Sequence, residues 1–203
     1  FVQLAQQIGA NTLLDMVDLL GLSEDIVLAN NIVIPSAILP SAEDLSAPAA
    51  LANFSFGQGR LMITPLHVTR MTAVAATGGI LPSPSVVMSV IDEQGNPSEQ
   101  PARGGETGIS ARSALKLRHM MEAVVSDGTG KAAQTKQGNA AGKTGTAETG
   151  QIDHERTINH SWFTGYYPAD APKYIITVLV EDHQPNQKSA AGLFCEIINN
   201  LNE

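Results

Sequence analysis

The sequence has little cysteine and no block of like charge. Its single cysteine, Cys195, excludes an internal disulfide and a cysteine-rich metal site. The five histidines are never paired at the spacing of metal ligands, so we expect no metal and no cofactor. The twelve basic residues are scattered and the net charge is -8, a field that opposes nucleic acid. We therefore expect no nucleic-acid partner.

The chain also lacks a long apolar run and the pattern of a signal peptide. A membrane span needs roughly 20 consecutive apolar residues, and no stretch of the sequence approaches that length. The first residues, Phe1 to Ala5, already lie in a helical pattern with neither an initiator methionine nor a helix cap. We therefore expect that more sequence lies upstream of residue 1.

The bulk composition is that of one globular domain. The chain has 203 residues, of which 43% are hydrophobic and 16% charged. A domain of this length buries about 70% of the surface of its unfolded chain, which is enough for a substantial core.

The order of predicted elements indicates an α+β fold. Apolar residues recur at helical spacing in four segments, which are residues 1–20, 64–79, 110–125 and 189–201. Strands are predicted over residues 142–148, 160–167 and 174–180, with a small hairpin around residues 86–95. Residues 21–50 show no sustained period and are expected to be irregular, with a short helix after Pro48. Helices therefore come first, then an antiparallel sheet, then a terminal helix.

The stretch Gly-Asn-Ala-Ala-Gly-Lys-Thr-Gly-Thr, residues 138–146, is the richest candidate for chemistry. A phosphate-binding loop needs four residues between its glycines, whereas Gly138 and Gly142 enclose three. Such a loop also follows a buried strand and opens a helix, but residues 144–150 are rich in threonine and glycine, which are poor helix formers. The pattern therefore does not favour a nucleotide site.

A strand is the better interpretation of this stretch. Side chains alternate along a strand, so Lys143 and Gly145 would share one face and Thr144 would lie on the other. Gly145 has no Cβ and would let a ligand approach the backbone closely, while Thr146 offers a hydroxyl and an N–H. An ammonium, a hydroxyl and a free edge N–H can bind an acyl donor that carries a carboxylate. The alternative is a plain surface strand, which a three-residue match does not exclude.

Lys143-Thr144-Gly145 resembles the Lys-Thr-Gly box of the penicillin-binding protein transpeptidases. Further segments are similar to the same family in the same order along the chain, namely residues 1–9, 55–59, 63–66, 75–79, 120–130 and 162–168. The Thr-Ala-Glu sequence after the box, residues 146–148, is more like the monofunctional class B members. The resemblance thus covers essentially the whole chain.

The resemblance implies the fold shared with serine β-lactamases, an antiparallel sheet flanked by helices, of which residues 1–203 are an incomplete C-terminal part. The family also needs a serine in a Ser-x-x-Lys box and a Ser-x-Asn box. Ser113 and Lys116 match the first pattern but follow the Gly-Gln-Gly turn, residues 57–59, whereas the family places its nucleophile upstream of that turn. No Ser-x-Asn triplet precedes Lys143. We therefore expect both boxes upstream of Phe1, and the isolated chain to be inactive.

The function that the resemblance implies is peptidoglycan D,D-transpeptidation through a serine acyl-enzyme. The substrates would be stem peptides ending in D-Ala-D-Ala, and β-lactams would mimic them. Lys143 and Thr146 would act in catalysis, and Thr144, Gly145 and Thr146 would bind substrate. The upstream part of the same domain would complete the site, at the extracytoplasmic face of the bacterial membrane, anchored by an upstream segment. The alternatives are a β-lactamase, a β-lactam-sensing domain and a non-catalytic scaffold.

Overall fold

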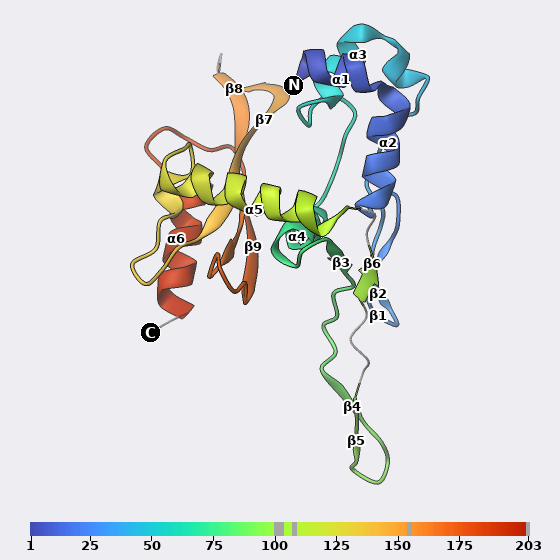
Figure 1. Ribbon diagram of the computed structural model, residues 1–203, viewed down its shortest axis with the longest axis vertical. Helices are drawn as coiled ribbons and strands as arrows, with labels where there is room; N and C mark the ends of the chain where they lie inside the picture. Colours follow the sequence, from blue (N-terminus) through green and yellow to red (C-terminus); the bar gives the residue numbers. More distant parts are fainter. Residues whose placement is uncertain (100–103, 107–108, 154–155, 202–203) are drawn as a thin grey trace.

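A three-stranded antiparallel sheet in the order β7-β8-β9 forms the centre of the C-terminal half. A computed structural model describes residues 1–99, 104–106, 109–153 and 156–201 of the chain. The strands are β7 (Ala141–Asp153), β8 (Arg156–Tyr167) and β9 (Tyr174–Val180). Helix α6 (Ala190–Leu201) lies against β8 and β9, helix α4 (Pro65–Ala76) contacts the same two strands, and α5 (Ala111–Ser126) lies against β7 (Figure 1). The expected α+β arrangement of helices around an antiparallel sheet is confirmed.

The N-terminal half is built from short elements. Besides α4, its helices are α1 (Val2–Ile8), α2 (Ala10–Leu19), α3 (Pro48–Phe54) and a 3-10 turn at Asp44–Ser46. Its strands form small pairs, β1 (Ile26–Ala29) with β2 (Ile32–Ile34), β3 (Ile80–Pro82) with β6 (Gly104–Glu106), and β4 (Ser89–Ile91) with β5 (Pro97–Glu99). The β4–β5 hairpin projects away from the rest of the molecule in Figure 1. A second 3-10 turn, Lys131–Ala133, follows α5.

Two expectations about this half are corrected. Residues 1–20 form two helices rather than one, because Gly9 has a φ of 86° and turns the chain between α1 and α2. Residues 21–50 contain the β1–β2 hairpin, although they were expected to be irregular. Its sequence, Ile-Val-Leu-Ala-Asn-Asn-Ile-Val-Ile at residues 26–34, is two β-branched runs joined by asparagines, which is a readable hairpin signal.

The main core lies between β8 and α6. Phe163 and Phe194 are both fully buried, with ring centroids 4.9 Å apart and planes tilted by 57°. Val178 and Ile198 pack into the same cluster. Phe163 therefore packs against the terminal helix α6. Successive strand residues face opposite sides, so Trp162 points to the other face of the sheet.

Helix α4 begins with a capping box, as the Thr-Pro pair predicts. The Thr64 hydroxyl accepts the backbone N–H of His67, and the Thr64 N–H donates to His67 Nδ1 at 3.2 Å. His67 Nδ1 also contacts the Thr64 hydroxyl at 2.8 Å, and its Nε2 is buried without a partner among the described residues. Burial, with a smaller contribution from the positive charge of Arg70, lowers the pKa of His67 below 6.5.

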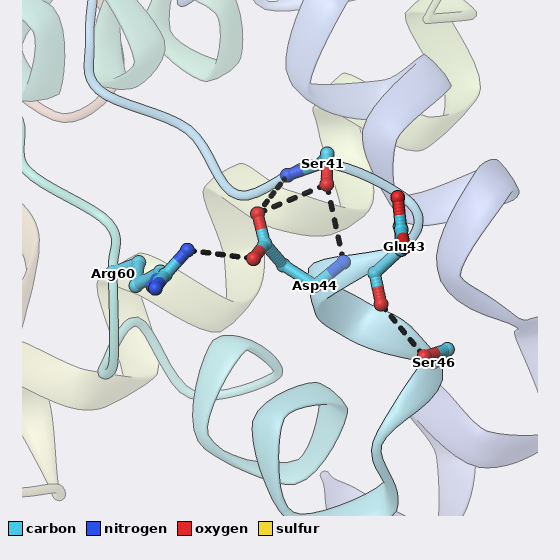
Figure 2. A network of polar contacts seen from close by, with 5 residues as sticks. All are labelled: Ser41, Glu43, Asp44, Ser46 and Arg60. Carbon is cyan, nitrogen blue, oxygen red and sulfur yellow. Dashed lines mark hydrogen bonds and ion pairs between the residues drawn. The ribbon is translucent and has the colours of Figure 1, made fainter.

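An ion pair fastens the loop before α3 to the Gly-Gln-Gly turn. Asp44 accepts hydrogen bonds from the Ser41 N–H at 3.0 Å and the Ser41 hydroxyl at 2.9 Å, and pairs with Arg60 at 2.6 Å (Figure 2). The two hydrogen bonds from Ser41, and to a smaller extent the charge of Arg60, hold the pKa of Asp44 below 3.8. A carboxylate whose pKa is depressed in the folded state stabilises the fold above its unfolded pKa, and that contribution disappears as the pH falls through the folded value.

Replacing Ile198 by Ala should lower the free energy of unfolding by about 2–5 kcal/mol, because a fully buried side chain leaves a cavity beside Phe194. Ile197 is the neighbouring residue of the same type but is 39% exposed, so Ile197→Ala should cost below about 1 kcal/mol. Urea denaturation of the two variants measures the difference. Equal losses would contradict the assignment of the core.

Replacing Asp44 by Asn should lower the melting temperature at neutral pH, and the difference from the parent should vanish in acid below the Asp44 pKa. The control is Glu43→Gln, since Glu43 contributes its backbone carbonyl to this network. Calorimetry across the acid range tests the sign. A deficit in Asp44→Asn that does not depend on pH would rule out the charge as its cause.

Candidate active site

The Lys-Thr-Gly stretch lies on β7, the edge strand of the sheet. Lys143 is paired with Thr164 of β8, Thr144 with Phe163 and Gly145 with Trp162. Strand β7 has β8 on one side and no strand on its other side among the described residues. The stretch is therefore an extended edge, as predicted, and the geometry of a phosphate-binding loop before a helix is absent from it.

The two faces of β7 differ in their surroundings. Lys143 and Gly145 are exposed and share the face of Trp162 and Thr164. The Lys143 ammonium donates to the Thr144 carbonyl at 2.6 Å and has a longer contact of 3.5 Å with the Thr144 hydroxyl. An exposed ammonium bonded to its own strand is free to turn toward a ligand, because the hydrogen bond that it leaves is replaceable by water.

The threonines of the box lie on the opposite face. Thr144 is half-buried, and its hydroxyl contacts the Thr129 hydroxyl at 2.7 Å, in the loop after α5. Thr146 shares this face and is exposed. Thr129 was not singled out from the sequence, since its contact with Thr144 links residues 15 positions apart.

Two glycines of β7 have different surroundings. A Cβ on Gly142 would collide with the Phe163 ring and lie 2.7 Å from the Thr164 carbonyl oxygen. A Cβ on Gly145 would meet the Trp162 Cβ at 3.4 Å, an ordinary contact. Gly142 is therefore required for the packing of β7 on β8, whereas the space beside Gly145 would admit a small side chain or a ligand.

An open, largely apolar cleft of about 620 Å³ reaches the Lys143 side of the sheet. Helices α2, α4 and α5 supply most of its walls, and Lys143, Thr72 and Thr164 line the end at the sheet. Met16, Met71 and Leu117 are among its apolar lining residues. The cleft combines an apolar groove with a single ammonium at one end.

The Ser-x-x-Lys match on α5 has no sign of an activated serine. Ser113 lines the same cleft, but its N–H and hydroxyl are engaged by the Ser110 hydroxyl in the first turn of the helix, each at 3.1 Å. Lys116 is exposed on the same helix. Ser113 therefore belongs to the cap of α5, in agreement with its interpretation as a chance match.

Polar side chains of β8 and of the turn after β9 pair with one another. Asp182 lies in the turn after β9, pairs with Arg156 at 2.7 Å and donates its N–H to His160. His154, in the polar segment between two of the predicted strands, lies outside the described residues. Within the ranges that the structure describes, no group of three or more His, Cys, Asp or Glu side chains is placed to hold a metal ion. Likewise, no helix in that part of the chain is long and apolar enough to cross a membrane.

Comparison with known proteins places this geometry in a family. The model of the penicillin binding protein transpeptidase domain matches residues 1–199. The chain is 32% identical to the peptidoglycan D,D-transpeptidase PbpA of Mycobacterium tuberculosis over 197 residues, which cover 95% of this chain and 38% of that protein. It is 31% identical to the penicillin-binding protein PbpB of Mycolicibacterium smegmatis, over 97% of this chain and 32% of PbpB.

Solved structures agree with the sequence comparison. The crystal structure of penicillin-binding protein 3 from M. tuberculosis with aztreonam superposes with a TM-score of 0.84 at 27% identity, over 98% of this chain and 47% of that one. The imipenem acyl-enzyme complex of penicillin-binding protein A from M. tuberculosis gives 0.83 at 28% identity, over 99% and 44%. The chain thus spans less than half the length of these relatives. From the Lys-Thr-Gly edge strand, the sheet around it and these matches together, the chain belongs to the penicillin-binding protein transpeptidase domain family.

Proposed function

We propose that residues 1–203 are the C-terminal portion of one transpeptidase domain, and that the whole protein is a peptidoglycan D,D-transpeptidase. The observation that carries the proposal is the placement of Lys143, Gly145 and Thr146 on an edge strand beside an open cleft. The name of the relative PbpA supports the reaction, and the imipenem acyl-enzyme of penicillin-binding protein A supports covalent catalysis.

The reaction would have two acyl transfers. A serine hydroxyl from the upstream part of the domain attacks the carbonyl of the penultimate D-Ala, and the terminal D-Ala leaves as an amine after taking up a proton. An amine of a second stem peptide then attacks the ester, which restores the serine and forms the cross-link. A β-lactam opens on the same serine and stays attached, because its leaving group remains part of the adduct.

The β7 edge would bind the donor in this scheme. In an antiparallel ladder the N–H and C=O of one residue point to the same edge, and residues two apart share that edge. The Thr144 carbonyl is reached by the Lys143 ammonium, which indicates that it faces the open side. The Thr146 N–H would then face the same side and donate to the developing oxyanion, a contribution of about 3 kcal/mol in comparable sites.

The side chains of the box would have complementary roles. Lys143 supplies positive charge beside the cleft and helps to move the proton from the serine. The exposed Thr146 hydroxyl and the Thr144 hydroxyl would bind the carboxylate of the donor. For Thr144 this requires its hydroxyl to exchange the Thr129 contact for the ligand, or to bind both at once, since a hydroxyl has one hydrogen and two acceptor positions.

The upstream part of the same domain is the partner that the apolar cleft requires. A cleft lined by methionine and leucine side chains from three helices is unfavourable in contact with water. We assign it to the helix that carries the serine nucleophile, because an apolar helix there would bring the serine toward Lys143. The whole protein would work outside the cytoplasmic membrane on the cell wall, with an anchor upstream of this segment.

Replacing Lys143 by Ala in the full-length protein should slow acylation by a fluorescent penicillin about a hundredfold or more, the size expected for removal of one preorganised electrostatic group. The control is Lys116→Ala, which removes an exposed lysine of α5 and should leave the rate unchanged. Stopped-flow fluorescence measures both rates, and the adduct should persist for many minutes after washing. A rapidly hydrolysed adduct would indicate a β-lactamase, and the absence of any adduct on the parent would refute the proposal.

The 203-residue chain by itself should form no adduct, and labelling of Ser113 would show that our assignment of the nucleophile is wrong.

Replacing Gly145 by Ala should leave folding intact but slow acylation, since the new methyl group stands on the face of the strand that the ligand approaches. Gly142→Ala should instead unfold the protein or lower its melting temperature markedly, because its Cβ has no room beside Phe163. Circular dichroism and the acylation rate separate the two effects. A Gly145→Ala variant with the parent rate would argue against ligand binding along this edge.

A further inference from the structure

A chain of four threonine hydroxyls connects α4 with β8 and β9. Thr72 contacts Thr164 of β8 at 2.6 Å, Thr164 contacts Thr177 of β9 at 2.8 Å, and Thr177 contacts Thr69 at 2.8 Å. At both of its ends this threonine chain reaches a backbone carbonyl oxygen of α4. Thr69 reaches the Pro65 carbonyl at 2.8 Å and Thr72 reaches the Val68 carbonyl at 2.9 Å.

The threonine chain has fewer hydroxyl hydrogens than oxygen–oxygen contacts. Five oxygen–oxygen contacts join its members, but four hydroxyl groups supply only four hydrogens. A carbonyl at each end supplies none. One contact therefore always lacks a hydrogen, and the chain as a whole is short of a donor.

The donors in these contacts locate the missing hydrogen. Thr69 is the donor both to the Pro65 carbonyl and to the Thr177 hydroxyl, so its single hydrogen serves two contacts. Thr72 donates to the Val68 carbonyl, so Thr164 donates to Thr72 and accepts from Thr177, which occupies one of the two lone pairs of the Thr164 oxygen. Thr164 is therefore able to accept a hydrogen bond from a donor outside the chain.

Lys143 is the donor placed to supply it. Thr164 is its cross-strand partner, so the two side chains stand next to each other on the same face of the sheet. Both line the same cleft. The ammonium has three hydrogens, and its nearest acceptor is the Thr144 carbonyl, with a longer contact to the Thr144 hydroxyl.

We propose that Thr164 is a positioning residue for Lys143: its hydroxyl accepts the lysine ammonium and holds it over the cleft-side face of the sheet. In the present structure the ammonium bonds instead to its own strand. Transfer to Thr164 would turn the charge toward the cleft and tie its position, through the threonine chain, to helix α4. The proposal rests on the function of Lys143 proposed above.

Three variants of the full-length protein test the proposal. Thr164→Val removes the acceptor but keeps the shape of the side chain, and Thr164→Ser restores the oxygen. Thr177→Val is the matched control, because it also removes one hydroxyl and two contacts of the chain but leaves the acceptor opposite Lys143. The readouts are the acylation rate constant at saturating penicillin, the dissociation constant of the initial complex and the melting temperature.

We expect Thr164→Val to lower the saturating rate constant about tenfold, as befits a hydrogen bond to a charged group, with little change in the dissociation constant. Thr164→Ser should recover most of the rate, and Thr177→Val should stay near the parent rate even where both valine variants melt at a similar, lower temperature. Equal rate losses in Thr164→Val and Thr177→Val would show that the chain only supports the fold and would overturn the proposal. So would a parent rate in Thr164→Val, or failure of serine to restore it. Acylation of the parent protein decides the proposed function separately from these ratios.

Discussion

The antiparallel pairing of β7 with β8 is the constraint on which the proposed site depends. It sets Lys143 opposite Thr164 and Gly145 opposite Trp162, and it leaves the other edge of β7 without a strand partner among the described residues. A slip of one residue would move the ammonium to the opposite face and away from the cleft. Gly142 helps to fix this register, since the Phe163 ring occupies the space that any larger residue would need. The packing of the core on one face of the sheet and the chemistry proposed for the other face therefore depend on the same strand register.

The elements with strong local signals were predictable from the sequence. Helix α4 begins at its Thr-Pro cap, α5 begins after Ser110, and β9 has the predicted bounds. The predictions for residues 1–20 and 21–50 were wrong because one local signal overrode another. Gly9 interrupts a continuous helical period through its positive φ, and the asparagines of residues 30–31 join two short strands, a turn signal that the absence of a sustained period concealed. Strands β7 and β8 extend beyond the predicted ends because each supplies the other with hydrogen-bond partners, a tertiary effect that neither segment shows alone.

The proposed site was also predictable in part from local signals. Lys143, Thr144, Gly145 and Thr146 are consecutive, so one short motif reveals them and strand alternation assigns their faces. The threonines around them are not consecutive. Thr72 and Thr164 are 92 positions apart and Thr69 and Thr177 are 108 apart, and no periodicity connects such residues. Threonine is also common in strands and helices for reasons unrelated to hydrogen-bond networks, so only the fold identifies these as a connected group.

A crystal structure of the full domain acylated by a penicillin would test the central claim most directly. The account predicts that the penicillin carboxylate lies within hydrogen-bond distance of the Thr146 hydroxyl, that the acyl carbonyl oxygen accepts the Thr146 N–H, and that the Lys143 ammonium lies in the cleft rather than on the Thr144 carbonyl. An adduct whose carboxylate and carbonyl oxygen bind elsewhere, with the β7 edge exposed to solvent, would contradict it.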